Sequence, residues 1–337
     1  MRLSSLTRLV LSSVWLLCAN ALAQDQKPNN SRLFPIKVDG KWGYIDASGE
    51  LRIPAQYSDV DEFGELDVEP VSVAVGDLWG FINKEGEWIV EPRFHLAWNC
   101  VDDFAIAEMD DGKWRFINHD GDLIDGVGYD NIQCFEAGHA AVILQGDHQW
   151  TYIDVKHSRI LPLRQSIPEG FSEGLVPMNT GSLWGFVDES GTFVIPPMFD
   201  EANAFSEGLA AVRVGDLWGY ADKLGKIVIP PQFGWAYGFE GGLAGVELEH
   251  RYGFINHDGK FVVPPKFQDV RFFSEDLAAV EQDSKWGYID RQGNVAVETR
   301  FDIRALPFRG GIAQVTLWGG DVGYINKSGE YVWKPSH

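Results

Sequence analysis

Histidine side chains are the groups in this sequence that could bind a metal ion. Zinc takes imidazole and thiolate ligands in a tetrahedral arrangement, so a cluster of histidines would suit it. Four of the eight histidines lie close together in the sequence, but their spacings match no short metal-binding motif. We therefore predict no metal ligand and no cofactor. The four residues are His119, His139, His148 and His157.

Motifs that mark common catalytic sites are also missing. The sequence contains no nucleophile elbow, no phosphate-binding Walker loop, no dinucleotide fingerprint and no HExxH motif. Adjacent carboxylates occur at residues 102–103 and 110–111, but such pairs in loops are usually solvated surface groups. We expect a protein that is not an enzyme, with hydrolysis at an unrecognised site as an alternative.

Two cysteines, Cys100 and Cys134, could form a disulfide. They are 34 residues apart, which places them in nearly the same position of two adjacent repeats. In an oxidising compartment this placement favours a bond between them. The alternative is that each is a small apolar residue buried by itself.

An aromatic-glycine motif recurs nine times and organises the elements that carry these residues. Its full form is Trp-Gly-Tyr or Trp-Gly-Phe, then an aliphatic residue and Asp or Asn, and four successive gaps are each 34 residues. A period in this range indicates stacked or radially arranged units. The nine copies begin at Trp42, Trp79, Trp114, Trp150, Trp184, Trp218, Tyr252, Trp286 and Val322.

Each unit is predicted to contain three strands, as residues 209–233 illustrate. An apolar strand over 209–214 is followed by the hairpin signal Gly215-Asp216 and a second strand over 217–222. Both faces of the second strand are apolar in most units, which indicates a strand covered on two sides. Its glycine, Gly219, predicts a slot filled by a large side chain of the neighbouring unit. A short third strand ends at prolines, which cannot continue a sheet ladder.

The fifth motif position is always Asp or Asn and predicts a capped turn. Its side-chain oxygen can accept hydrogen bonds from the backbone N–H groups that follow, and in eight units a glycine three residues later can take a positive φ. Since Asp and Asn alternate, turn capping explains the position better than a row of cation sites. The predicted caps are Asp46, Asn83, Asn118, Asp154, Asp188, Asp222, Asn256, Asp290 and Asn326.

The full repeat, best seen over residues 209–233, resembles the bacterial WG-repeat family, also called the KWG-repeat family. The resemblance extends over residues 33–335. It implies a β-rich module that is often exported, and it carries over no catalytic residue. Units three and four depart from the pattern, because Arg115 and Thr151 replace the motif glycine and residues 126–129 replace the proline element. We expect looser packing there.

The predicted fold is all-β: tandem three-stranded repeats of about 34–36 residues that form an open, twisted array. The first unit begins with its own first strand (33–38), and the last ends with its own third strand (331–333). Propellers often close by splitting a blade between the two termini, and no such split is present. A closed, propeller-like ring is the alternative.

The N-terminal residues predict export. Arg2 and Arg8 precede a short apolar run, and Ala21 and Ala23 suit a signal peptidase, so residues 1–23 are predicted to be a signal peptide. Lipidation at Cys18 is disfavoured because a small residue is required before the cysteine. Residues 24–32 would form a short flexible N-terminus. We expect a periplasmic or extracellular protein whose mature chain contains no transmembrane segment.

The net charge of the chain limits the kinds of partner that it could bind. The net charge of −21 disfavours nucleic acid and anionic membranes and favours cationic partners, although acidity also serves solubility. We expect a binding or scaffolding module for a protein or peptide partner in the cell envelope. Glycan or peptidoglycan binding is the alternative, because exposed tryptophans outside the motif could stack on sugar rings. These tryptophans are Trp88, Trp98, Trp235, Trp318 and Trp333.

Overall fold

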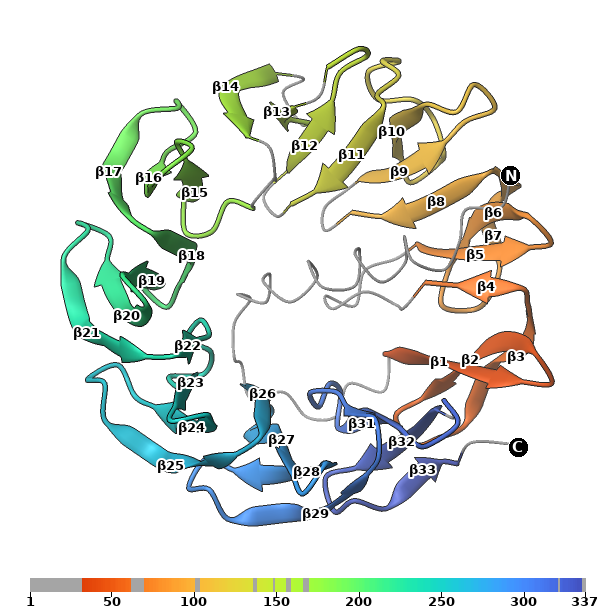
Figure 1. Ribbon diagram of the computed structural model, residues 1–337. Helices are drawn as coiled ribbons and strands as arrows, with labels where there is room; N and C mark the ends of the chain where they lie inside the picture. Colours follow the sequence, from red (N-terminus) through yellow and green to blue (C-terminus); the bar gives the residue numbers. More distant parts are fainter. Residues whose placement is uncertain are drawn as a thin grey trace.

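The chain forms a ring of nine small antiparallel sheets, which we call blades 1 to 9 in chain order (Figure 1). The computed structural model describes residues 32–61, 70–100, 104–135, 138–147, 149–155, 159–165, 170–320 and 322–334. Every regular element in these ranges is a strand, so the all-β prediction is confirmed. The predicted signal peptide, His148 and His157 lie outside the described residues.

The last strand of each complete blade lies at the outer wall, as β17, β21, β25 and β29 show in Figure 1. Blades 1 to 3 consist of β1 (Leu33–Val38), β2 (Lys41–Asp46) and β3 (Leu51–Tyr57); β4 (Asp59–Val60), β5 (Val71–Val75), β6 (Leu78–Ile82) and β7 (Trp88–Phe94); and β8 (Leu96–Asn99), β9 (Phe104–Glu108) and β10 (Trp114–Asn118). Blades 4 to 6 consist of β11 (Asn131–Cys134), β12 (His139–Ile143), β13 (Trp150–Asp154) and β14 (Arg159–Gln165); β15 (Val176–Asn179), β16 (Trp184–Val187) and β17 (Phe193–Phe199); and β18 (Glu201–Ser206), β19 (Leu209–Val214), β20 (Leu217–Asp222) and β21 (Ile227–Phe233). Blades 7 to 9 consist of β22 (Trp235–Ala236), β23 (Ala244–Leu248), β24 (Arg251–Ile255) and β25 (Phe261–Phe267); β26 (Asp269–Ser274), β27 (Leu277–Gln282), β28 (Lys285–Asp290) and β29 (Val295–Phe301); and β30 (Arg304–Ala305), β31 (Ile312–Thr316), β32 (Val322–Asn326) and β33 (Tyr331–Trp333).

Seven of the nine blades contain a strand that the sequence did not predict, which is a fourth strand in six of them and is present in blade 3 without an outer strand. It is the innermost strand, formed by the connector between repeats. In blade 6, β18 pairs with β19 from Glu201 opposite Arg213 to Ser206 opposite Leu209, with a shift in register between Ala202 and Phe205. Blade 8 has the same shift, and in blades 2, 7 and 9 the inner strand is only two residues long. Neither form gives the extended alternation that identifies a strand in sequence.

The motif glycine is required by the outer strand of its own blade. Trp218 pairs with Phe233 and Tyr220 with Ile229, so three residues of β21 bulge opposite Gly219. A Cβ atom on Gly219 would lie 2.5 Å from the carbonyl oxygen of Ile229. The bulge contains two prolines, which lose no ladder hydrogen bond at such a position. The slot therefore exists, but the prediction that a neighbour's side chain fills it is wrong.

The apolar core consists of nine clusters, one between each pair of adjacent blades. Between blades 6 and 7, for example, Trp218 and Tyr220 pack against Ala236 and Phe239. The second aromatic residue of the motif is buried in all nine blades. The first position is half-buried in seven blades and buried only at Trp218 and Trp286. The prediction that the second strand is covered on both sides thus holds fully for the second aromatic residue and only in part for the indole rings.

The ring closes between blades 9 and 1, so the prediction of an open array is wrong and the alternative, a closed ring, is correct. Figure 1 shows β1–β3 beside β31–β33. One apolar cluster contains Phe34 and Ile45 of blade 1 together with Ile312 and Tyr324 of blade 9. The Tyr324 hydroxyl donates a buried hydrogen bond of 2.8 Å to the carbonyl oxygen of Pro35.

Phe34 explains how the ring closes without a split blade. Blade 1 has no innermost strand among the described residues. In blade 6 that strand places Phe205 opposite Ala210, and blade 8 repeats this pair as Phe273 and Ala278. Phe34 occupies the alanine position of blade 1, and its ring centroid lies 5.6 Å from that of Tyr324. The larger side chain therefore fills the volume that the missing strand would fill.

Pro35 replaces the hydrogen bonding of the missing strand. At the equivalent position of blade 7, the Gly245 carbonyl accepts a hydrogen bond from the N–H of Tyr237 beside the inner strand. The Pro35 carbonyl instead accepts the Tyr324 hydroxyl, and proline has no N–H that would need a partner. Residues of the two terminal blades thus supply the hydrogen bonds across the junction between blades 9 and 1. The ring closes without a split blade, so the absence of such a split does not indicate an open array.

Candidate binding site

The predicted turn caps form their hydrogen bonds in eight units. In blade 6, the Asp222 carboxylate accepts the N–H groups of Leu224 (2.9 Å) and Lys226 (3.0 Å). The same pair of bonds is present at the other described turns. In the fourth unit, residues 156–158 of the turn after Asp154 lie outside the described ranges. The described residues contain no group of three or more metal-ligating side chains placed to bind an ion.

Of the four histidines of units three and four, the two described ones, His119 and His139, lie in different blades. His119 is half-buried in the outer turn of blade 3, whereas His257 at the equivalent place in blade 7 is exposed. His139 is buried at the start of β12, and its Nε2 lies 3.6 Å from a carboxylate oxygen of Glu189 in blade 5. The centroid of the His139 ring lies 4.7 Å from that of Phe171 in a tilted arrangement, so His139 is part of the packing between blades 4 and 5.

Cys100 and Cys134 are joined as a disulfide, with their Cα atoms 5.5 Å apart. Cys100 follows β8 of blade 3, and Cys134 ends β11 of blade 4. The bond therefore links the inner parts of two adjacent blades.

The tryptophans outside the motif are dispersed. Trp318 is 81% exposed, Trp88 39% and Trp235 36%, whereas Trp98 and Trp333 are half-buried. The three exposed residues belong to blades 9, 2 and 7, so no two of them lie on adjacent blades.

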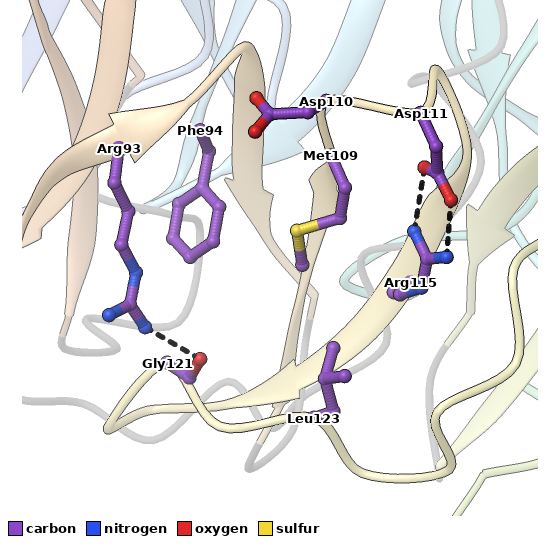
Figure 2. Close-up of a pocket in the computed structure, with 8 residues that line it drawn as sticks. All are labelled: Arg93, Phe94, Met109, Asp110, Asp111, Arg115, Gly121 and Leu123. Atoms are coloured by element: carbon purple, nitrogen blue, oxygen red, sulfur yellow. Dashed lines mark hydrogen bonds and ion pairs between the residues drawn. The ribbon is translucent and has the colours of Figure 1, made fainter.

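A hollow of about 520 Å³ between blades 2 and 3 is the candidate binding site (Figure 2). Phe94, Met109 and Leu123 contribute apolar atoms to it. Four charged residues and a glycine complete the lining. The whole lining comes from the end of β7, the turn between β9 and β10, β10 itself, and the loop that follows: Arg93, Phe94, Met109, Asp110, Asp111, Arg115, Gly121 and Leu123.

The hollow lies where blade 3 departs from the repeat. In six other blades a Cβ at the motif glycine would strike the backbone of the outer strand, so a side chain there is incompatible with that strand's usual path. Blade 3 has Arg115 at this position. Only isolated pairings, Trp114 with Tyr129 and Ile117 with Leu123, remain where an outer strand would lie. The expectation of looser packing in unit three agrees with this missing strand.

Both arginines of the hollow are held by partners. Arg115 donates two hydrogen bonds to the Asp111 carboxylate, at 2.8 and 2.5 Å. These bonds hold the pKa of Asp111 well below its ordinary value. Arg93 donates to the Gly121 carbonyl oxygen at 2.8 Å and thereby fixes the loop of blade 3 against blade 2.

The chemistry of the hollow favours binding. Its lining residues include no hydroxyl, thiol or imidazole group, so they supply apolar contact and charge rather than a nucleophile. Sequence reasoning identified the Arg115 substitution but did not identify the hollow. The signal was present in the loss of both the motif glycine and the prolines, which together remove the outer strand.

Comparison with known proteins identifies the repeat. The model of the family described as "WG containing repeat" matches residues 42–65, 79–114, 184–218, 218–249, 252–286 and 286–317, more than half of the chain. No match begins at the motifs of units three, four and nine. None of the curated proteins matches this chain.

Solved structures share the fold at low identity. A crystal structure of a eukaryotic initiation factor has a TM-score of 0.62 at 10% identity and covers 91% of this chain and 95% of its own. The computationally designed Ika8 protein has a TM-score of 0.50 at 11% identity, with 79% and 95% covered. Such likeness concerns the fold alone. The described part of the chain contains no helix with the length and apolar character needed to cross a membrane.

Proposed function

This protein belongs to the WG containing repeat family, and we propose that it is an exported binding module that holds a protein or peptide partner in the cell envelope. The observation that carries the proposal is the hollow between blades 2 and 3. It interrupts an outer wall that the repeat builds regularly elsewhere, and it presents apolar side chains to solvent.

The loop that contributes Leu123 to the hollow carries further exposed apolar residues. Leu123 is 51% exposed, and Ile124 and Val127 on the same loop are also exposed. Clustered apolar surface of this kind marks interaction sites in soluble proteins. The loop is held by the bond from Arg93 to Gly121 and by the pairing of Trp114 with Tyr129, so the surface is preorganised for a partner.

Site-specific photocrosslinking in intact cells tests this proposal. A photoreactive amino acid at Leu123 is expected to capture a defined protein or peptide. The matched control is Leu224, which is 88% exposed in the outer turn of blade 6. If position 123 gives no product, or the same products as position 224, the hollow is not a binding site and the proposal is overturned.

Glycan binding has less support in the structure. A sugar chain would need several aromatic faces on one surface, and the three exposed tryptophans lie on three blades that are not adjacent. The hydrolase alternative required convergent acidic or histidine side chains in a deep pocket. The hollow contains no histidine, and its Asp111 is already paired with Arg115.

A further inference from the structure

We propose that the segment of the partner that occupies the hollow is basic and carries an apolar anchor side chain. This inference rests on the proposed binding function and specifies the chemistry of the partner. It is carried by the charge and the apolar surface that blade 3 places together at one site.

Blade 3 concentrates negative charge around the hollow. Residues 109–130 contain six aspartates against one lysine and one arginine. The two cations are neutralised within the blade, because Arg115 binds Asp111 and Lys113 binds Asp130. Arg93 of blade 2 also lines the hollow, and it keeps its positive charge because its partner is the carbonyl oxygen of Gly121. An incoming ligand therefore meets this one cation and the four remaining carboxylates of blade 3, which belong to Asp110, Asp120, Asp122 and Asp125.

The remaining carboxylates are open to a partner. Asp110 lines the hollow with its side chain 98% exposed, and the Nε2 atom of His95 lies 3.2 Å from its carboxylate. Asp120 and Asp122 flank Gly121 and are exposed, and no cation among the described residues lies within ion-pair distance of either carboxylate. Lysine or arginine side chains of a bound segment would supply the positive charge that these carboxylates lack.

The apolar part of the hollow requires an anchor. Met109 and Leu123 are accessible beside the buried ring of Phe94, and the volume of about 520 Å³ lies within the range of ligand-binding pockets. A leucine, methionine or phenylalanine of the partner would remove these surfaces from water. The overall charge of −21 attracts a basic segment from a distance, and the hollow selects one that also carries an apolar residue.

Peptide binding by the whole purified protein tests the inference. The probe is a fluorescently labelled peptide of alternating leucine and lysine, and the matched peptide has glutamate in place of lysine. Anisotropy is expected to show binding of the lysine peptide and none of the glutamate peptide. Binding should weaken at least about tenfold in the Asp110→Asn/Asp122→Asn variant, which corresponds to about 1.4 kcal/mol, and also in Leu123→Ser.

Control variants separate the site from the general acidity of the protein. Asp216→Asn/Asp283→Asn removes two exposed carboxylates of blades 6 and 8, and Leu224→Ser removes an exposed leucine. Both are expected to change the affinity less than about twofold. Equal losses in the control and site variants would show that the peptide responds to net charge alone, which overturns the inference. Capture at position 123 of a partner without a basic segment would also overturn it while leaving the proposed function intact.

Discussion

The second residue of the motif sets the path of the outer strand in each blade. Where it is glycine, as at Gly219, the outer strand bulges towards it. Where blade 4 has Thr151, the outer strand pairs directly with it, because Thr151 lies opposite Arg164. Where blade 3 has Arg115, the outer strand is reduced to isolated pairings. The path of the outer strand therefore changes in both blades that lack the motif glycine, and in blade 3, which lacks the prolines as well, the strand is lost.

A Gly219→Ala substitution is expected to destabilise the protein by about 1–3 kcal/mol. The added Cβ would overlap the backbone of Ile229 and Pro231, which cannot move without breaking the bulge. The control is Gly238→Ala, whose Cβ would meet only the Ser206 side chain at an ordinary 3.5 Å. Urea unfolding measures both. Equal stability of the two variants would contradict this account of the motif.

Asp46 gives blade 1 a pH-dependent turn. Burial raises the pKa of its carboxyl, but hydrogen bonds from Ser48, Arg52 and backbone N–H groups outweigh this effect and lower the pKa from 3.8 to about 2. A lowered native pKa means that the carboxylate stabilises the fold above about pH 4, and that this stabilisation is lost as the pH falls towards 2.

The Asp46→Asn variant tests this titration. Asparagine retains the cap but loses the charge that Arg52 binds, so we expect a loss of about 1–2 kcal/mol at pH 7. The difference from wild type should shrink between pH 4 and 2, because the wild-type carboxyl becomes protonated there. Thermal unfolding of both proteins at several pH values measures this difference in stability. Asn83 caps the turn of blade 2 without a charge, which shows that an asparagine can form this cap. Parallel curves for the two proteins would refute the assignment.

At the scale of elements, polar contacts hold adjacent blades together in addition to the apolar clusters between them. Glu207 of blade 6 accepts the N–H of Gly242 in blade 7 at 2.9 Å and pairs with His257 at 3.2 Å. Glu173 and Glu275 repeat this arrangement towards blades 6 and 9, where lysines take the place of the histidine. These contacts come from the connector that the sequence did not identify as a strand, so local pattern alone did not reveal them.

The disulfide between blades 3 and 4 is a prediction for the protein in solution. We expect the exported protein to contain the Cys100–Cys134 bond, and mass spectrometry after alkylation under non-reducing, denaturing conditions would detect it. The closed loop spans 34 residues, for which the chain-entropy model gives about 3–4 kcal/mol of stabilisation. Replacing both cysteines with serine should lower the midpoint of urea unfolding accordingly. Two alkylated thiols in the unreduced protein would contradict the bond.

At the scale of the whole molecule, the seam between blades 9 and 1 is the one junction that no chain connection reinforces. A Tyr324→Phe variant removes the hydroxyl bound to Pro35 and should cost about 1 kcal/mol. The matched control is Tyr220→Phe, which loses the equivalent bond to the Tyr237 carbonyl between connected blades.

Hydrogen exchange distinguishes these two variants. We expect faster exchange of backbone amides in β1 and β2 of Tyr324→Phe and no change there in Tyr220→Phe, because only the first variant weakens the seam. Unchanged exchange in blade 1 of the Tyr324→Phe variant would show that this bond does not hold the ring closed.

The sequence by itself determined the features that depend on neighbouring residues. The all-β class, the period, the hairpins and the Asx-capped turns follow from contacts within a few positions, such as Asp222 with the N–H groups of Leu224 and Lys226. The burial of the second motif aromatic also followed, because strand alternation fixes which side chains share a face.

Only the tertiary structure decided the closure and the binding site. Closure joins Tyr324 to Pro35, 289 residues away, and depends on the rotation accumulated over nine blades, which no single repeat specifies. The hollow required the course of the loop after β10, which is set by packing and by the bond from Arg93 of blade 2 to Gly121 of blade 3. Both features arise from the relative placement of blades, and local sequence preferences act only within a blade.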